Sequence, residues 1–258
     1  MGINWANAPG KVPARLRGGL RRGQQTGRLR GVVHFAIFQN ICPMNMSALG
    51  YARNIRSGFE QGGANMFKKT SDKRVAAFFA EGLEECEGLV VCDLLYRAGI
   101  RTDKVSISDN LAVTSSHEVT IVCDRTIHDD DFSFDDYDLL FLPGGMPGSN
   151  NLRACEMLCN ALRSFASAGK DVAAVCAAPY ILAELGLLKD RRATSNPGFQ
   201  HVLTEHGAKL SQDPVVVDGN LITSQGLGTS IELGLTLVGR YLGDEAVEST
   251  KGKIVYMR

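Results

Sequence analysis

From Lys73 to the carboxyl terminus, short apolar runs alternate with amphipathic stretches, which is the pattern of successive strand and helix units in a parallel sheet. The apolar runs predict strands over residues 74–79, 105–108, 111–115, 119–123, 139–142, 172–175, 215–217 and 221–223. The last two are joined across Asp218-Gly219, which predicts a hairpin. Apolar residues at helical spacing predict helices over residues 84–98, 152–168 and 229–242, and Pro179 indicates the start of another. The chain from 73 to 258 is therefore predicted to form one α/β domain with a mostly parallel sheet.

The residues before this domain differ from it in charge. Residues 1–72 contain eleven lysines and arginines and two acids, whereas residues 73–258 contain 17 basic and 26 acidic residues. The formal net charge of zero thus combines a segment at +9 with a domain at −9. An arginine-rich, glycine-rich segment with no acid before Glu60 is typical of an organellar, for example mitochondrial, transit peptide or of a disordered basic extension. Both interpretations of residues 1–72 stay open, and binding to phosphates or a membrane surface is a third use of such charge.

Composition argues against several other classes of protein. No run reaches about 18 consecutive apolar residues, so we expect no membrane span. Seven cysteines, an odd number without framework spacing, favour a reducing compartment over a disulfide scaffold. Cys155 and Cys159 lie four residues apart without a second Cys or His pair, so we expect no metal site. The acid-rich run 124–138 lacks the pattern of a calcium loop and is predicted to be a solvated loop or face. We expect the domain to be cytoplasmic and to bind no nucleic acid.

Candidate chemistry gathers where the predicted strands end, because open α/β sheets bind ligands outside the carboxyl ends of their strands. Three segments fall there: the acidic residues Glu84, Glu85 and Glu87, the turn Gly144-Gly145, and Cys176. Taken alone, the glutamates are also compatible with an ordinary charged first turn of a helix.

Cys176 stands between a predicted strand and the helix that Pro179 begins. A tight turn there exposes the thiol, and the helix N-terminus is expected to bring its pKa below the free value of about 8.5, so that the thiolate is the nucleophile. Backbone N–H groups at Gly144, Gly145 and Ala177 predict an oxyanion site beside it. By itself, Cys176 is more typical of a buried structural thiol, since cysteine is among the most buried residue types.

Several motifs occurring in order make the assignment more specific. They are AEGLEECE at residues 80–87, DLLYRAGI at 93–100, LPGG at 142–145, VCAAP at 175–179 and TSQGLGTS at 223–230. In their order and spacing the domain resembles the ThiJ/PfpI family, in the branch of the Parkinsonism-associated protein deglycase and its close bacterial relatives. The resemblance covers residues 73–258 and excludes the basic extension.

The resemblance implies a flavodoxin-like α/β sandwich, with three layers and a nucleophile-elbow cysteine, that forms homodimers and needs no cofactor. It identifies Cys176 with the reactive cysteine of the family and Glu87 with the carboxylic acid that hydrogen-bonds its sulfur. Gly145 and Ala177 correspond to the oxyanion donors. Arg97 corresponds to a basic residue near the site at a dimer interface.

Two departures from the family pattern limit its transfer. Asn196 stands where many relatives carry a histidine near the nucleophile, and Ala177 stands where the protease and amidotransferase branches have a histidine. A Cys-His dyad and peptide hydrolysis are therefore disfavoured. The five histidines are accordingly predicted to be surface or core residues: His34, His117, His128, His201 and His206.

The implied activity is that of a glutathione-independent glyoxalase or protein deglycase that acts on methylglyoxal-type dicarbonyls and their early protein adducts, with a role in oxidative stress. The alternative is a redox sensor or chaperone that acts through oxidation of Cys176 and through partner proteins. Both functions would use the same thiol, because a nucleophilic cysteine is also prone to oxidation. The sequence does not separate them.

Overall fold

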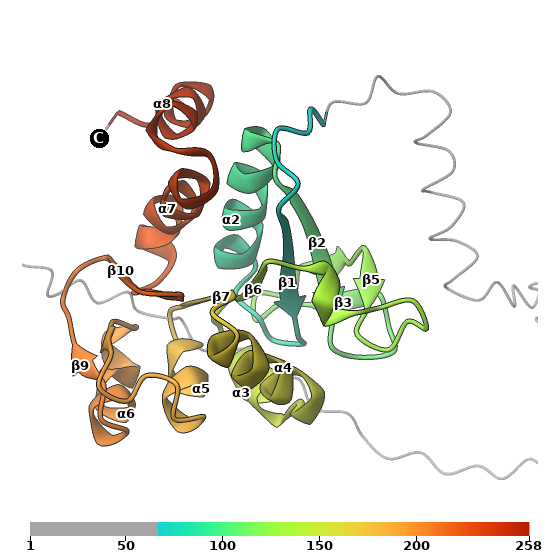
Figure 1. Cartoon of the computed structure of the whole chain (residues 1–258). Coiled ribbons are helices and arrows are strands. Elements are labelled where there is room, and N and C mark those ends of the chain that lie inside the picture. Colours follow the sequence, from blue (N-terminus) through green and yellow to red (C-terminus); the bar gives the residue numbers. More distant parts are fainter. Residues whose placement is uncertain (1–66, 258) are drawn as a thin grey trace, which may run out of the picture. The chain divides into compact units, whose positions relative to one another are not determined.

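A seven-stranded sheet is the centre of residues 67–257, the part of the chain that the computed structural model describes (Figure 1). Its strands lie in the order β10-β11-β7-β6-β1-β2-β5. They are β1 (Arg74–Phe79), β2 (Arg101–Ser106), β5 (Arg125–Thr126), β6 (Leu139–Leu142), β7 (Asp171–Val175), β10 (Val215–Asp218) and β11 (Leu221–Ser224). Every neighbouring pair is parallel except the β10–β11 hairpin. The predicted mostly parallel sheet and its hairpin are confirmed.

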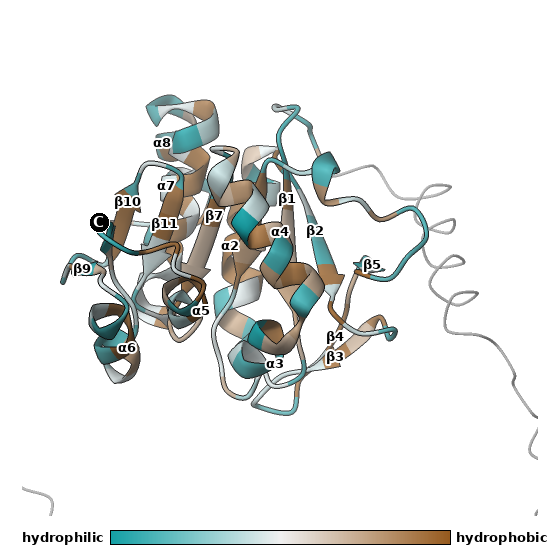
Figure 2. Ribbon diagram, turned by 60° about the horizontal axis from the view of Figure 1, so that its bottom comes forward, coloured by the Kyte–Doolittle hydropathy of each residue, from teal (hydrophilic) through white to brown (hydrophobic). Residues whose placement is uncertain are grey.

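Helices cover both faces of this sheet and complete a three-layer sandwich (Figure 1). One face carries α2 (Glu85–Ala98), α7 (Ser230–Leu242) and α8 (Asp244–Lys253), and the other carries α3 (Gly148–Ala154), α4 (Glu156–Ser167), α5 (Pro179–Glu184) and α6 (Gln200–Glu205). Side chains of β1 alternate between the two cores: Val75 packs with the α2 and α7 residues, and Ala76 with those of α4 and α5. Because both faces of the central strands are buried, their residues form continuous apolar runs in the sequence. The hydropathy colouring of the central strands shows these runs (Figure 2).

Local signals explain the ends of α2, the helix that carries the acidic residues. The Glu84 side chain caps its first turn by accepting from the N–H of Glu87 at 2.6 Å. Gly99 ends it in the left-handed conformation at φ 85°, which glycine adopts without steric cost. The predicted helix over 84–98 is confirmed to within one residue.

Several predicted boundaries are wrong, and each has a local cause. The helix expected over 152–168 is two helices, α3 and α4, because Cys155 has an extended conformation (ψ 98°) that ends one and begins the next. The strand expected at 105–108 is β2, which begins at Arg101 because its polar first half pairs in register with β1. The short strands β3 (Ala112–Thr114) and β4 (Thr120–Val122) form a separate hairpin.

Elements with little apolar periodicity were not predicted. They include α6, α8, β5 and the two-stranded pair of β8 (Arg192–Ala193) and β9 (Lys209–Leu210). α8 has one buried residue, Thr250, and packs on α7 and α2. No helix in the described range is long and apolar enough to cross a membrane.

The segment 67–72, which was predicted to belong to the basic extension, contacts the domain. The ring of Phe67 lies 4.9 Å from that of Tyr96 on α2. Thr70 donates its backbone N–H to the carbonyl of Gly99 at 3.0 Å and its hydroxyl to that of Ala98. Residues 1–66, to which the targeting and disorder interpretations chiefly apply, lie outside the described residues.

Candidate functional site

Cys176 occupies a strained turn at the carboxyl end of β7. Its φ is +63°, a left-handed conformation that is uncommon for a residue with a side chain and that persists only where its surroundings enforce it. Hydrogen bonds hold both sides of the residue: its N–H donates to the carbonyl of Ser224 at 3.0 Å, and its carbonyl accepts from the N–H of Asn196 at 2.8 Å. The helix α5 follows at Pro179, as predicted. The turn leaves the thiol partly exposed at the edge of the sheet.

Glu87 brings a carboxyl group to this thiol from the first turn of α2. Its residue surface is 1% exposed. The carboxyl accepts from the N–H of Gly144 at 3.0 Å and from the N–H of Leu227, and it shares a hydrogen bond with the thiol of Cys176. The pairing predicted for Glu87 and Cys176 is therefore present in the molecule. It arises because β7, β6 and β1 are neighbours in the sheet, so the segments after them converge.

The two glycines after β6 have different roles. A Cβ on Gly144 would lie 2.5 Å from Oε2 of Glu87 and 2.6 Å from Cβ of Cys176, so a side chain there would separate the pair. Gly145 has φ +91°, and a Cβ on it would lie 2.1 Å from the backbone nitrogen of Glu84. Glycine is required at both positions by close approach of the chain.

Backbone donors surround the sulfur, although not all those expected. The N–H groups of Gly145 and Ala177 form hydrogen bonds to Cys176, as their predicted place in an oxyanion site requires. The N–H of Gly144 instead donates to Glu87. Its predicted place among the oxyanion donors is wrong, because burial of the Glu87 carboxyl requires a donor there.

The charge states of Glu87 and Cys176 depend on each other. Burial raises the pKa of the Glu87 carboxyl to about 7. Burial, followed by the negative charge of Glu87, raises the pKa of the Cys176 thiol to about 12. The expectation that the helix N-terminus lowers this pKa is wrong, because burial of the thiol, followed by the charge of Glu87, outweighs the N-terminus of α5, which is only six residues long. Each of the two groups thus affects the proton of the other, and the thiolate is the form in which the proton that they share lies on Glu87.

Other predicted residues lie apart from this pair or take different roles. Arg97 is at the far end of α2, 43% exposed, and pairs with Asp93 at 2.6 Å; within one chain it does not join the site. Asn196 does reach the site, through its backbone bond to Cys176. The four histidines in the described range are all exposed: His117, His128, His201 and His206. His34 lies outside the described residues.

Leu227 and Gly226 belong to the site but were not singled out from the sequence. Leu227 contributes a backbone N–H to Glu87, and a Cβ on Gly226 would lie 3.9 Å from Sγ of Cys176. Both fall within the TSQGLGTS motif, which was the available signal. Because every residue except proline carries a backbone N–H, the sequence does not show which residue donates one to the site.

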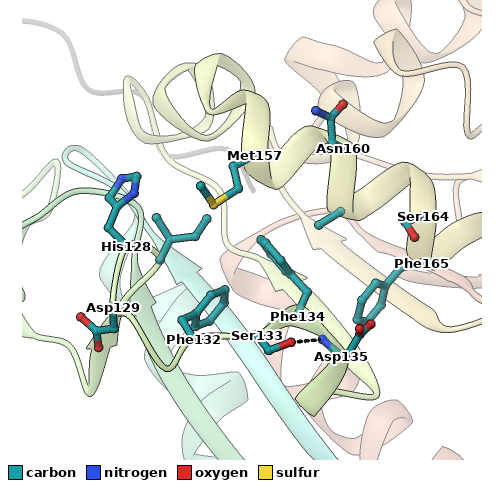
Figure 3. Close-up of a pocket in the computed structure, with 12 residues that line it drawn as sticks. His128, Asp129, Phe132, Ser133, Phe134, Asp135, Met157, Asn160, Ser164 and Phe165 are labelled. Carbon is teal, nitrogen blue, oxygen red and sulfur yellow. Dashed lines mark hydrogen bonds between the residues drawn. The ribbon is translucent and has the colours of Figure 1, made fainter.

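Two further features of the described residues are candidates for ligands. Ligand atoms of Glu84, Glu85 and His117 lie within 4.8 Å of one another, a spacing that could hold a metal ion, but Glu84 caps α2 and Glu85 bonds to His117 at 3.0 Å. A cavity of about 720 Å³ lies between the loop 127–135 and α4, lined by Phe132, Phe134 and Phe165 among others (Figure 3). Its lining contains neither Glu87 nor Cys176. Neither feature supplies a nucleophile.

Comparison with known proteins agrees with the motifs and the fold. The DJ-1/PfpI family model matches residues 73–240. Protein dj-1beta of Drosophila melanogaster is 36% identical over 184 residues, which are 71% of this chain and 97% of that protein. Glutathione-independent glyoxalase DJR-1.2 of Caenorhabditis elegans is 31% identical over 169 residues, which are 66% and 88% of the two chains. The crystal structure of Drosophila DJ-1beta matches with a TM-score of 0.67 at 33% identity, covering 72% of this chain and 100% of that one. The flavodoxin-like α/β prediction is confirmed, and the chain belongs to the DJ-1/PfpI family.

Proposed function

We propose that this protein is a glutathione-independent glyoxalase that converts methylglyoxal-type dicarbonyls to hydroxy acids and also removes their early adducts from proteins. The observation that carries the proposal is the shared hydrogen bond between the buried carboxyl of Glu87 and the thiol of Cys176. A nucleophile beside a proton carrier is the arrangement that covalent aldehyde chemistry requires. The relative from C. elegans, named as a glyoxalase of this type, supports it.

The reaction can be written with these two side chains and water. The thiolate of Cys176 adds to the aldehyde carbon, and the oxygen of that carbon takes the proton held by Glu87, which gives a hemithioacetal. Glu87, now a carboxylate, removes the hydrogen of the same carbon and returns a proton to the neighbouring carbon, while the hydroxyl proton passes to the second oxygen. The product is a thioester with the same atoms as the hemithioacetal. Water then cleaves the C–S bond, releases the hydroxy acid and restores the thiol.

Turnover of methylglyoxal without glutathione tests this proposal. The full chain should form lactate, and Cys176→Ser should abolish product formation while the folded state is kept. Cys123→Ser is a matched control, since Cys123 is a buried thiol far from Glu87 in the sequence and has no carboxyl partner of this kind. Absence of lactate formation by the unmodified protein would reject the enzymatic function.

A redox sensor is the second candidate, favoured by the partial exposure of Cys176. Two molecules of hydrogen peroxide would each transfer one oxygen atom to the sulfur and each leave as one molecule of water, which takes the thiol through a sulfenic acid to a sulfinate. Protonated Glu87 would then donate a hydrogen bond to a sulfinate oxygen. Mass spectrometry after limiting peroxide should find 32 Da added at Cys176 before any other thiol; oxidation elsewhere first would reject this candidate.

Homodimerisation is a further part of the proposal. Leu89 and Tyr96 are seven residues apart on α2, so they share a helix face, and they are 37% and 45% exposed. Exposed apolar side chains on one face of a helix indicate a surface that can be buried against a second copy of the chain. Sedimentation should give about twice the chain mass of 27.9 kDa. A monomer at all concentrations would contradict this and would remove any role for Arg97 across an interface.

A further inference from the structure

The turn after β11 passes close to the thiol at Gly226. This residue has an extended backbone, φ 161° and ψ −163°, which any residue can adopt. A Cβ placed on it would lie 3.7 Å from Oε1 of Glu87 and 3.9 Å from both Sγ of Cys176 and Nδ2 of Asn196. These are ordinary contact distances, unlike those at Gly144 and Gly145. Neither the backbone nor close packing therefore requires glycine at 226, and the missing side chain leaves a space of about one carbon atom bordered by the three polar groups.

The amide of Asn196 has a fixed orientation toward that space. Its Oδ1 accepts from the backbone N–H of Gly198 at 3.0 Å and caps the 3₁₀ turn of Pro197–Phe199. Oxygen must therefore face Gly198, so Nδ2 faces Gly226. Within the described residues, Nδ2 donates no hydrogen bond to the protein. A positioned amide donor without a partner is suited to an oxygen atom of a ligand.

We propose that the space over Gly226 receives the second carbonyl group of the dicarbonyl substrate, with Nδ2 of Asn196 donating a hydrogen bond to its oxygen. The inference rests on the proposed glyoxalase function. When Glu87 removes the proton from the first carbon, negative charge develops on this second oxygen, and the Asn196 amide stabilises it. Because Gly226 has no side chain, there is room for a substituent on the carbon of this second carbonyl group. The site therefore accepts 1,2-dicarbonyls that carry a substituent there.

Gly226→Ala tests the assigned space, with Gly228→Ala as the matched control on the same turn. A Cβ at 228 would have no atom within 4 Å. Turnover of glyoxal, methylglyoxal and phenylglyoxal should be compared. Gly226→Ala should lower kcat/KM for phenylglyoxal about tenfold more than for glyoxal, which is the scale of discrimination by one or two carbons in a pocket. Gly228→Ala should match the unmodified protein. No decrease for any of the three substrates would overturn the role of Gly226, and an equal decrease for all three would overturn its part in setting the size of the substituent.

Asn196→Ser tests the hydrogen bond to the second oxygen. Serine retains a side-chain oxygen to cap the turn but loses the amide donor and adds no charge. Its kcat should fall on the order of a hundredfold, as for other donors to developing charge, while iodoacetamide still alkylates Cys176 at the unmodified rate. Unchanged kcat would overturn the role of Asn196.

Alkylation separates this inference from the function on which it rests. Gly226→Ala should slow the reaction of Cys176 with bulky N-phenylmaleimide more than with small iodoacetamide, and Gly228→Ala should slow neither. This measurement requires no turnover. If the unmodified protein makes no lactate, the glyoxalase proposal fails, but selective slowing would still place the space beside the thiol; equal rates with both reagents would reject it.

Discussion

Two regions of the domain contain thiols whose pKa is raised by burial, and they differ in what surrounds the sulfur. Cys123 after β4 is buried in the apolar core, and Cys92 on α2 is partly buried against it; the ion pair of Lys104 and Asp124 lies beside them. Burial raises the pKa of both thiols to about 12. Burial and Glu87 raise that of Cys176 to a similar value.

The two regions differ in whether a group beside the sulfur can accept the proton of the thiol. At Cys176 a carboxyl with a pKa of about 7 is hydrogen-bonded to the sulfur, and two backbone N–H groups face that sulfur. Within the described residues, no carboxyl is hydrogen-bonded to the sulfur of Cys92 or Cys123. The charge of Lys104 lowers the pKa of these two thiols, but burial raises it by more. A thiol in a partly buried turn thus becomes a nucleophile when a neighbouring group can hold its proton, and burial or a short helix alone is insufficient.

Replacement of that neighbour should have the largest effect. Glu87→Gln retains the volume of the side chain but cannot carry a proton, so methylglyoxal turnover should fall on the order of a hundredfold or more. Cys176 should still be alkylated. Glu85→Gln is the matched control, because Glu85 lies on the same turn and pairs with His117 instead. Near-normal activity of Glu87→Gln would show that the assigned role is wrong.

The same carboxyl should make stability depend on pH. In the folded state its pKa is raised from 4.5 to about 7, so the folded chain keeps a proton that the unfolded chain has lost. The contribution of Glu87 to stability should therefore be greatest below about pH 4.5 and fall by about 3 kcal/mol as the pH rises to 7. Glu87→Gln should lack this decrease. Urea unfolding of both proteins at several pH values measures it, and parallel curves would contradict the raised pKa.

Two deletions should have a smaller effect and should differ from each other. Removing residues 1–66 should leave the melting temperature unchanged. Removing residues 1–72 also takes away the Phe67–Tyr96 contact and the bonds from Thr70 to α2, which should cost about 1 kcal/mol, or several degrees. Calorimetry of the two proteins gives the comparison. Equal melting temperatures would show that segment 67–72 does not stabilise the domain.

The sequence predicted the site better than it predicted the edges of the fold. Apolar runs located β1, β6, β7 and α2, and because parallel strands carry their carboxyl ends to one edge, the acidic segment with Glu87 and Cys176 were expected at the same edge. The pairing of Glu87 with Cys176 came from the family resemblance. The polar half of β2, the break at Cys155 and the helix α8 depend on pairing and packing, which leave little apolar periodicity. The Leu227 donor was not predicted because every residue except proline carries a backbone N–H. The predicted lowering of the Cys176 pKa was wrong, because the burial of a thiol depends on the tertiary structure and not on the residues next to it in the sequence.

The pH dependence of alkylation at Cys176 tests the central claim most directly. Because the pair loses its first proton near pH 7 and the sulfur accepts two N–H groups, its reaction with limiting iodoacetamide should rise with a midpoint near pH 7. Mass spectrometry should find Cys92 and Cys123 unlabelled throughout this range. Glu87→Gln should abolish the midpoint near 7. A midpoint at pH 9 or above in the unmodified protein, or first labelling of Cys86, would contradict the account that Glu87 holds the proton of a Cys176 thiolate.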